Sequence, residues 1–318
     1  MTPKLEIEHL TVEYPAGRGQ TVQAVSDVSF SLAPGETLGL VGESGCGKST
    51  MAKAVSLHVR PKGGSIRVDG RDLSTLRGGE LRRARTKLQM IFQDPVSALN
   101  PRRRVEDIVG EGLRIWGTGS ARERADKVRA TMEAVGLTYD PAAHRRPGHF
   151  SGGQCQRISI ARALILEPEV LICDEPVSAL DVSVQAQILN LLAELGERYE
   201  LTMLFISHDL AVVKHISDRI AVMYLGKVCE IATPELLYER PLHPYTATLL
   251  AAIPVPDPDA RPAPAPRFTD IPSPLDPPSG CRFRTRCSRA SARCATEEPV
   301  AREAAPGHVV ACHHPLAA

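Results

Sequence analysis

Short apolar runs recur along this chain and are separated by longer segments with helical spacing. The continuous runs predict buried strands at 37–41, 88–92, 170–173 and 201–207. Alternating apolar and polar positions predict antiparallel strands at 5–14 and 25–32, with a further strand at 65–71 and a hairpin over 220–231. Helical patterns cover 49–59, about 105–135, 158–166, 183–199, 234–239 and 243–252. Buried strands that alternate with helices predict an α/β fold with an N-terminal antiparallel β-subdomain.

The segment between the run at 37–41 and the next helix fits the pattern G-x-x-x-x-G-K-[ST]. It consists of Gly42, Glu43, Ser44, Gly45, Cys46, Gly47, Lys48, Ser49 and Thr50. Glycines let successive backbone N–H groups point inward, the helix N-terminus adds partial positive charge, and Lys48 adds a full charge. The pattern predicts a phosphate cradle, and Ser49 offers a hydroxyl to the Mg²⁺ of a nucleotide. A glycine-rich turn that binds nothing is the alternative.

Polar side chains follow several of the predicted buried strands. Gln93 follows the run at 88–92, Asp174 and Glu175 end the run at 170–173, and His208 ends the run at 201–207. Open α/β sheets bind ligands at the carboxyl ends of their strands, so these side chains predict one site. One carboxylate there can hold Mg²⁺ while the next orients or deprotonates water, and Gln93 can coordinate the metal or hold that water.

Two further signals depend on their position along the chain. Ser151, Gly152, Gly153 and Gln154 precede an apolar helix, so Ser151 is a plausible N-cap and the glycines allow an anion to approach the helix N-terminus. Tyr14 ends the first strand, where its ring could stack on an adenine. A core tyrosine is the alternative for Tyr14.

Composition narrows the class of protein. The 318 residues carry a formal net charge of +1, which gives no footprint for non-specific nucleic-acid binding. Neither a bilayer-spanning apolar run nor the core of a signal peptide is present, so we expect a cytosolic protein. Prolines dominate the stretch from 254 to 278, which predicts an extended linker.

Half of the cysteines crowd the C-terminal end, at Cys281, Cys287, Cys294 and Cys312. In a reducing compartment such a crowd indicates a metal site more often than disulfides. Zinc sites favour closer cysteine pairs, so the spacing argues mildly against zinc. Arginines between the cysteines could offset the charge of an iron–sulfur cluster, and His308, His313 or His314 could replace a thiolate; the arginines are Arg282, Arg284, Arg286, Arg289 and Arg293. Zinc and a metal-free tail remain open.

Taken in order, the cradle, Gln93, Ser151–Gln154, Asp174–Glu175, 178–181 and His208 resemble the ATP-binding-cassette (ABC) ATPases over residues 5 to about 232. The resemblance implies a P-loop core sheet, a helical signature subdomain near 94–160, and a head-to-tail dimer that clasps ATP. Lys48 would then grip the phosphates, and Ser49, Gln93 and Asp174 would serve Mg²⁺. Glu175 would polarise water, His208 would contact the γ-phosphate, Asp181 would communicate across the dimer, and Tyr14 would stack on adenine.

Residues 92–101, 150–158 and 243–245, together with the proline linker and the terminal cysteines, look like the ATPase subunits of dipeptide, oligopeptide and nickel importers. This resemblance implies an ATPase domain over 1–253, a linker over 254–280 and a cysteine-rich module over 281–318 that holds a [4Fe–4S] cluster. It also implies a related second ATPase, two membrane permeases and an external substrate-binding protein. The chain would sit peripherally on the cytoplasmic face of the membrane. Peptide, nickel, glutathione and other solutes remain open as cargo.

Two rival classes share these motifs. A DNA-repair ATPase of the cassette type would need a long coiled coil between the cradle and Ser151, and glycine and proline interrupt that stretch. A ribosome-acting cassette protein would normally carry two cassettes in one chain, whereas this chain has one. At the cradle itself, the helix N-terminus predicts that Cys46 is a reactive thiolate.

Overall fold

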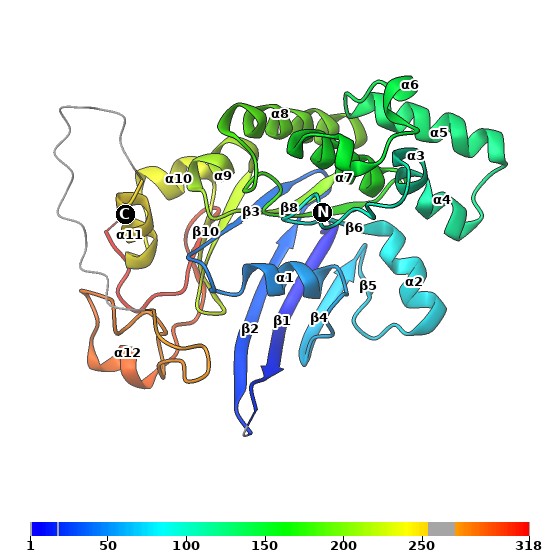
Figure 1. Cartoon of the computed structure of the whole chain (residues 1–318). Helices are drawn as coiled ribbons and strands as arrows, with labels where there is room; N and C mark the ends of the chain where they lie inside the picture. The colour runs from blue at the N-terminus through cyan, green and yellow to red at the C-terminus, as the bar shows by residue number, and fades with distance from the viewer. Residues whose placement is uncertain (1, 18, 254–270, 318) are drawn as a thin grey trace, which may run out of the picture.

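Two β-sheets form the frame of the molecule (Figure 1). The structure is a computed structural model that describes residues 2–17, 19–253 and 271–317. Most of the predicted linker therefore lies outside the described residues. None of the helices in these ranges is long and apolar enough to cross a membrane.

The larger sheet has a parallel centre. Its strand order is β11-β12-β10-β9-β3-β8-β7-β6, and the strands from β9 to β6 are parallel. The parallel strands are β3 (Thr37–Val41), β6 (Leu88–Ile91), β7 (Val170–Asp174), β8 (Thr202–Ile206) and β9 (Arg219–Tyr224). Every residue of β3, β7 and β8 is buried, which explains why these strands read as continuous apolar runs.

The smaller sheet is antiparallel, as the alternating N-terminal pattern predicts. Its order is β2-β1-β4-β5, formed by β1 (Leu5–Pro15), β2 (Thr21–Leu32), β4 (Gly63–Val68) and β5 (Arg71–Asp72). Helix α1 (Lys48–Val55) packs between this sheet and the central one, and its Met51 and Val55 are fully buried in the shared core. The N-terminal β-subdomain is therefore fastened to the helix that carries the phosphate cradle.

Helices cover the other face of the central sheet (Figure 1). They are α3 (Val105–Val109), α4 (Glu111–Trp116), α5 (Ala121–Ala134), α6 (Tyr139–Ala142), α7 (Gly152–Leu164), α8 (Val182–Tyr199), α9 (Leu210–Ile216), α10 (Pro234–Glu239) and α11 (Pro244–Ala251), with a 3₁₀ turn at Pro147–His149. The helical pattern near 105–135 is broken into three helices, at Gly110 and at Gly117, which has a positive φ of 64°.

Two details differ from the sequence prediction. Helix α1 ends at Val55 rather than Val59 because Leu57 adopts φ 61°, and the Leu57 and His58 amides donate to the carbonyls of Ala54 and Lys53. This arrangement is a Schellman cap, built here without glycine. Helix α2 (Gly78–Lys87) has no counterpart among the predicted elements, and Ala84 is its one buried residue.

The C-terminal segment joins the central sheet. Strands β11 (Arg302–Ala305) and β12 (His308–Val310) form a hairpin, and β12 pairs with β10 (Lys227–Ala232); a short helix, α12 (Ala292–Thr296), precedes the hairpin. The buried carboxylate of Glu230 accepts hydrogen bonds from the amides of Leu242 and His243 and lies 2.6 Å from His308 Nε2. The cysteine-rich segment is therefore attached to the central sheet through β10.

Candidate functional site

A cavity of about 700 Å³ opens at the carboxyl ends of the parallel strands. The described residues that line it are Tyr14, Val22, Ala24, Ser44, Gly45, Gly47, Lys48, Ser49, Thr50, Gln93, Glu175, His208 and Pro274. Tyr14, most of the cradle and the polar residues that follow β6, β7 and β8 thus share one space. Because parallel strands end at one edge of a sheet, residues far apart in the chain converge there.

Steric limits in the cradle explain two of its glycines. A Cβ atom on Gly42 would lie 2.1 Å from the Met223 carbonyl oxygen, and one on Gly47 would lie 2.1 Å from that of Ala24. Both glycines also have positive φ angles, 157° and 108°. The loop can therefore follow this path only without side chains at these two positions.

Lys48 is the cation of the cradle, and it is 5% exposed. Its ammonium group donates to the carbonyl oxygens of Gly42 at 2.7 Å and Glu43 at 3.2 Å. The side chain therefore folds back over the loop, and its ammonium group is already positioned to bind a phosphate group.

Oxygen ligands suited to Mg²⁺ meet beside the cradle. The Ser49 hydroxyl donates to Asp174 Oδ1 at 3.1 Å, and the Gln93 carboxamide lines the same cavity. Burial raises the pKa of Asp174, while the Ser49 hydrogen bond lowers it. Hydroxyl, carboxylate and amide oxygens are the hard ligands that Mg²⁺ prefers, so this donor set fits the ion.

Glu175 is the meeting point of the strand-end side chains. Its Oε2 atom accepts a hydrogen bond from Gln93 Nε2 and lies close to His208 Nδ1, both at 3.1 Å. Glu175 has a φ of 48°, and its amide donates to the Ile206 carbonyl oxygen at 3.0 Å. The left-handed backbone of a non-glycine residue is sparsely populated and is found preferentially at functional sites.

Ser151–Gln154 and Asp181 are not among the described residues that line this cavity. Ser151 caps α7 through a reciprocal capping box with Gln154, with distances of 3.3 and 3.0 Å. The predicted N-cap is therefore confirmed.

The start of α7 packs against the start of α8, the helix whose N-cap position is Asp181. A Cβ atom on Gly153 would lie 2.4 Å from Val184 Cγ1, so a side chain at this position would clash. Asp181 is exposed and makes no side-chain cap of α8, and the neighbouring Val182 is 83% exposed. Ser151–Gln154 and Asp181 thus contribute to one exposed surface, which lies outside the cavity of this chain.

The prediction of a reactive Cys46 is wrong. Cys46 is 4% exposed, and burial raises the pKa of its thiol despite the nearby Lys48. Desolvation disfavours the thiolate more than the helix N-terminus favours it. We therefore do not expect Cys46 to react readily with alkylating reagents in the folded protein.

The four C-terminal cysteines are free thiols. Burial, together with the charges of the other three cysteines of the group, raises the pKa of Cys281 to about 11. Among the described residues, however, no group of three or more His, Cys, Asp or Glu side chains is arranged to hold a metal ion. The residues as placed do not form a ready ligand set for a cluster.

The arginines between these cysteines have other contacts than the sequence suggested. Arg289 lowers the pKa of Cys287 and Cys312, but burial outweighs it. Arg293 instead pairs with Glu297 at 2.7 Å, and Arg284 donates to the Ser279 carbonyl oxygen. Arg282 donates to Gln23 of the N-terminal β-subdomain, and Arg286 donates to Glu43 of the cradle. Arg282, Arg284, Arg286 and Arg293 therefore bond to groups other than these cysteines, and a charge-balancing role for the five arginines stays a prediction.

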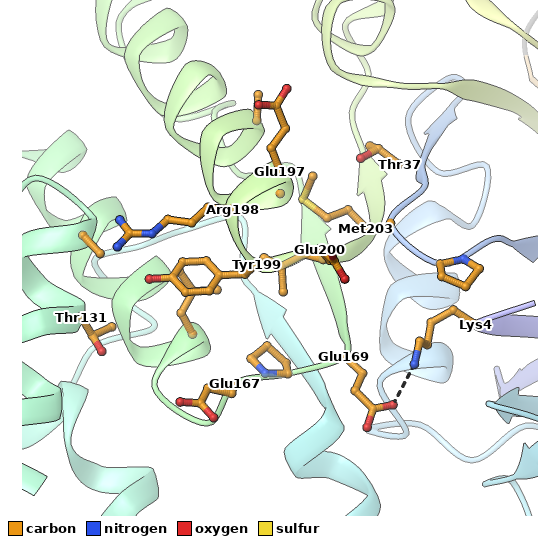
Figure 2. A pocket seen from close by; sticks show the side chains of 18 of the residues that line it. Lys4, Thr37, Thr131, Glu167, Glu169, Glu197, Arg198, Tyr199, Glu200 and Met203 are labelled. Carbon is orange, nitrogen blue, oxygen red and sulfur yellow. Dashed lines mark hydrogen bonds and ion pairs between the residues drawn. The ribbon is translucent and has the colours of Figure 1, made fainter. Parts of the chain in front are cut away.

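A second and larger hollow, of about 910 Å³, lies at the opposite edge of the parallel strands (Figure 2). It is lined by residues at the starts of β3 and β8 and at the end of α8, and Figure 2 shows the Lys4–Glu169 ion pair at its margin. Ligands of doubly wound sheets bind at the carboxyl edge, and none of the predicted site residues lines this hollow. The smaller cavity is the site.

Sequence reasoning missed contributions from the C-terminal half. Pro274 lines the cavity, and its carbonyl oxygen accepts a hydrogen bond from the Gln23 amide at 3.1 Å. The Tyr245 hydroxyl accepts a hydrogen bond from the Glu43 amide at 2.9 Å, although Tyr245 was singled out only for its family resemblance. Neither contact leaves a local signal in the sequence, because each joins positions more than two hundred residues apart.

The cradle, the strand-end carboxylate and the parallel sheet define a nucleotide-binding P-loop ATPase. The chain belongs to the family of ABC transporter ATPases: residues 25–178 match the family model described as ABC transporter, and residues 229–294 match the one described as the C-terminal region of oligopeptide/dipeptide transporters. The predicted family and ATPase fold are confirmed.

Relatives cover nearly the whole chain. The oligopeptide transport ATP-binding protein OppF of Salmonella typhimurium is 49% identical over 97% of this chain and 95% of its own length. A Brucella ovis protein with a provisional peptide import ATP-binding designation is 53% identical, with 98% of each chain covered. Among solved structures, the ATP-binding cassette MJ0796 in a dimeric post-hydrolysis state with ADP and Pi superposes with a TM-score of 0.66 and 28% identity; the match covers 72% of this chain and 98% of that one.

Proposed function

We propose that this chain is the ATP-hydrolysing subunit of an importer for di- or oligopeptides. Full-length similarity to oligopeptide transport ATP-binding proteins carries this proposal, because it includes the C-terminal region as well as the ATPase core. Nickel, glutathione or another solute is the alternative cargo within the same class.

The roles of the site residues follow from the chemistry of the cavity. Lys48 and the cradle amides bind the phosphates, and Tyr14 stacks on the adenine. Ser49, Gln93 and Asp174 hold Mg²⁺, which when bound offsets the charge of the phosphate oxygens. Glu175 orients the attacking water and accepts its proton, while His208 hydrogen-bonds to the terminal phosphate.

We further propose that the chain works as half of a head-to-tail pair. The exposed surface formed by Ser151–Gln154 and Asp181 lies outside the chain's own cavity, so this surface is available to complete the cavity of a partner. The dimeric state of the MJ0796 cassette supports this arrangement. The partner is a second copy or a related ATPase.

The pairing is tested by light scattering on a Glu175→Gln chain, which holds ATP without hydrolysing it. We expect a monomer without nucleotide and a dimer with ATP and Mg²⁺. Adding Ser151→Arg should abolish the dimer, because a long cationic side chain would fill the contact. Ser120→Arg is the matched control, since Ser120 forms the same capping box on α5 and is also exposed.

A dimer that persists with Ser151→Arg, or hydrolysis by isolated monomers, would refute the composite site. A chain that neither pairs nor hydrolyses alone, but does both when a second ATPase is added, would identify the pair as heteromeric.

The remaining partners follow from the physical need to move a solute across a membrane. By its similarity to oligopeptide transport ATP-binding proteins, the ATPase would drive two membrane permeases from the cytoplasmic face. The segment that follows Gln93 would transmit the movement to a permease helix. An extracytoplasmic binding protein would select the peptide.

The non-transport alternatives fit the fold less well. A DNA-repair cassette needs a long coiled coil between the cradle and Ser151, yet α5, with 14 residues, is the longest helix in that stretch, all of which the structure describes. A ribosome-acting protein would normally carry a second cassette. Transport is therefore the class that this chain supports best.

We retain a [4Fe–4S] cluster on Cys281, Cys287, Cys294 and Cys312 as a proposal, with zinc as its alternative. The proximity of the thiols supports it, although their side chains would have to rearrange to become ligands. Iron, sulfide and zinc should be measured on protein purified without oxygen. We expect iron and sulfide in equal amounts; zinc without iron would contradict the cluster, and neither metal would indicate a metal-free segment.

A further inference from the structure

The cysteine-rich segment reaches the phosphate cradle through Arg286. Both guanidinium nitrogens bind the Glu43 carboxylate, with Nη1–Oε2 at 2.7 Å and Nη2–Oε1 at 2.9 Å. The Arg286 side chain is 4% exposed, and that of Glu43 is 20% exposed. A bidentate, largely buried arginine–carboxylate pair fixes the orientation of both partners, unlike an exposed pair.

Aromatic residues hold this pair in place. Arg286 Nη1 donates to the Tyr224 hydroxyl at 3.3 Å, and its guanidinium lies near the rings of Tyr224 and Phe283. Tyr224, Tyr245 and Phe283 pack with ring centroids 4.6 to 5.3 Å apart. The rings come from β9, α11 and the cysteine-rich segment, so the pair sits where these three parts meet.

Glu43 belongs to the cradle itself. It lies between Gly42 and Ser44, and Lys48 donates to the carbonyl oxygens of Gly42 and Glu43. The Glu43 amide donates to Tyr245, and the Glu43 carboxylate accepts from Arg286. Both the backbone and the side chain of Glu43 are thus held from outside the loop.

A second contact ties the same segment to the cradle. Arg282 donates to Gln23 Oε1 at 2.6 Å and Ser26 Oγ at 2.9 Å, and also to the Leu225 carbonyl oxygen. Leu225 and Gly226 form the turn between β9 and β10, and the Gly226 amide donates to the Cys46 carbonyl oxygen at 2.8 Å. Arg286 therefore contacts Glu43 directly, and Arg282 is linked to Cys46 through this turn.

The negative charge of Glu43 is the reason why Arg286 affects the binding of ATP. A carboxylate beside a phosphate site repels the ligand, and this repulsion is weakly screened in a partly buried loop. Arg286 offsets that charge through the bidentate pair, and Glu43 is not among the described residues that line the cavity. Removal of one partner of such a pair leaves the other charge uncompensated.

We propose that Arg286 is a positioning residue for ATP binding: it neutralises and orients Glu43 of the cradle, so that the cysteine-rich segment helps to set the affinity of the ATPase for nucleotide. This role is independent of the transported cargo.

The test measures the ATP dissociation constant, the KM and the kcat of the full-length chain, alone and in a double-mutant cycle. Arg286→Gln should weaken ATP binding about tenfold, the scale of coupling between residues in contact, and should raise KM more than it changes kcat. Glu43→Gln should weaken ATP binding less than Arg286→Gln does, because it leaves no uncompensated negative charge beside the phosphates. The double variant with Arg286→Gln and Glu43→Gln should regain most of the ATP affinity that Arg286→Gln loses. Arg286→Lys keeps the positive charge and should lose less affinity than Arg286→Gln.

Arg293→Gln is the matched control. Arg293 lies in the same segment and pairs with Glu297, but both side chains are more than half exposed and the pair does not involve the cradle. It should leave the ATP dissociation constant unchanged.

A purely structural role for Arg286 predicts something different. In that case the double variant would bind ATP no better than Arg286→Gln. The midpoint temperature of thermal unfolding would also decrease together with the ATP affinity. Unchanged ATP binding in Arg286→Gln would also overturn the proposal. If Arg286→Gln fails to fold, Glu43→Gln and Arg286→Lys still decide: a Glu43→Gln chain that loses as much affinity as Arg286→Lys, or more, contradicts charge neutralisation.

Discussion

Replacement of Glu175 with glutamine is expected to slow ATP hydrolysis about a thousandfold, the scale of a lost general base, while ATP binding stays close to wild type. The Glu175 carboxylate contacts both Gln93 and His208 in the cavity, so it occupies the position from which water can be oriented. A carboxamide keeps the shape of the side chain but cannot accept the proton. Phosphate release and equilibrium ATP binding, measured on the same preparation, separate the two effects.

Glu197→Gln is the control for this prediction. Glu197 is exposed on α8 and lines the hollow at the opposite edge of the sheet, so its replacement should leave turnover unchanged. Undiminished hydrolysis by the Glu175→Gln chain would remove Glu175 from the mechanism, and loss of ATP binding would show that its role is structural.

Replacement of Lys48 with methionine should weaken ATP binding about a hundredfold, which corresponds to the loss of a hydrogen bond from a charged donor. Lys48 is buried and already held over the cradle by the carbonyls of Gly42 and Glu43. Methionine keeps the length and apolar stem of the side chain, so the packing around it changes little. Fluorescent ATP-analogue titration gives the affinity.

Lys53→Met serves as the matched control, because Lys53 lies on the same helix and is exposed. ATP binding should be unaffected in that variant. If Lys48→Met binds ATP as tightly as Lys53→Met, the assignment of the phosphate cation is wrong.

Much of the site could be predicted because its residues follow local rules. The cradle is one contiguous segment, and Gln93, Glu175 and His208 each follow an apolar strand. The parallel order of those strands then places all three at one edge. Ser151 was recognisable because a capping box is a short-range pattern.

The rest depends on contacts between distant parts of the chain. Arg286 was assigned to the cysteines because they are its neighbours in sequence, but it pairs with Glu43, 243 positions away. Cys46 was expected to be reactive because helix position is readable from sequence, whereas its burial depends on packing. The hairpin β11–β12 could not be foreseen as part of the sheet, because its pairing with β10 joins Glu230 to Val310.

The β11–β12 hairpin limits where the chain can be truncated. Strand β12 covers the outer edge of β10, and β11, short and bearing Arg302 and Glu303, becomes the last strand of the sheet. A chain cut at the proline-rich stretch would lose this cover and expose the free backbone groups of β10. Open edges of this kind pair with strands of other molecules, so an ATPase core produced without its tail would tend to aggregate.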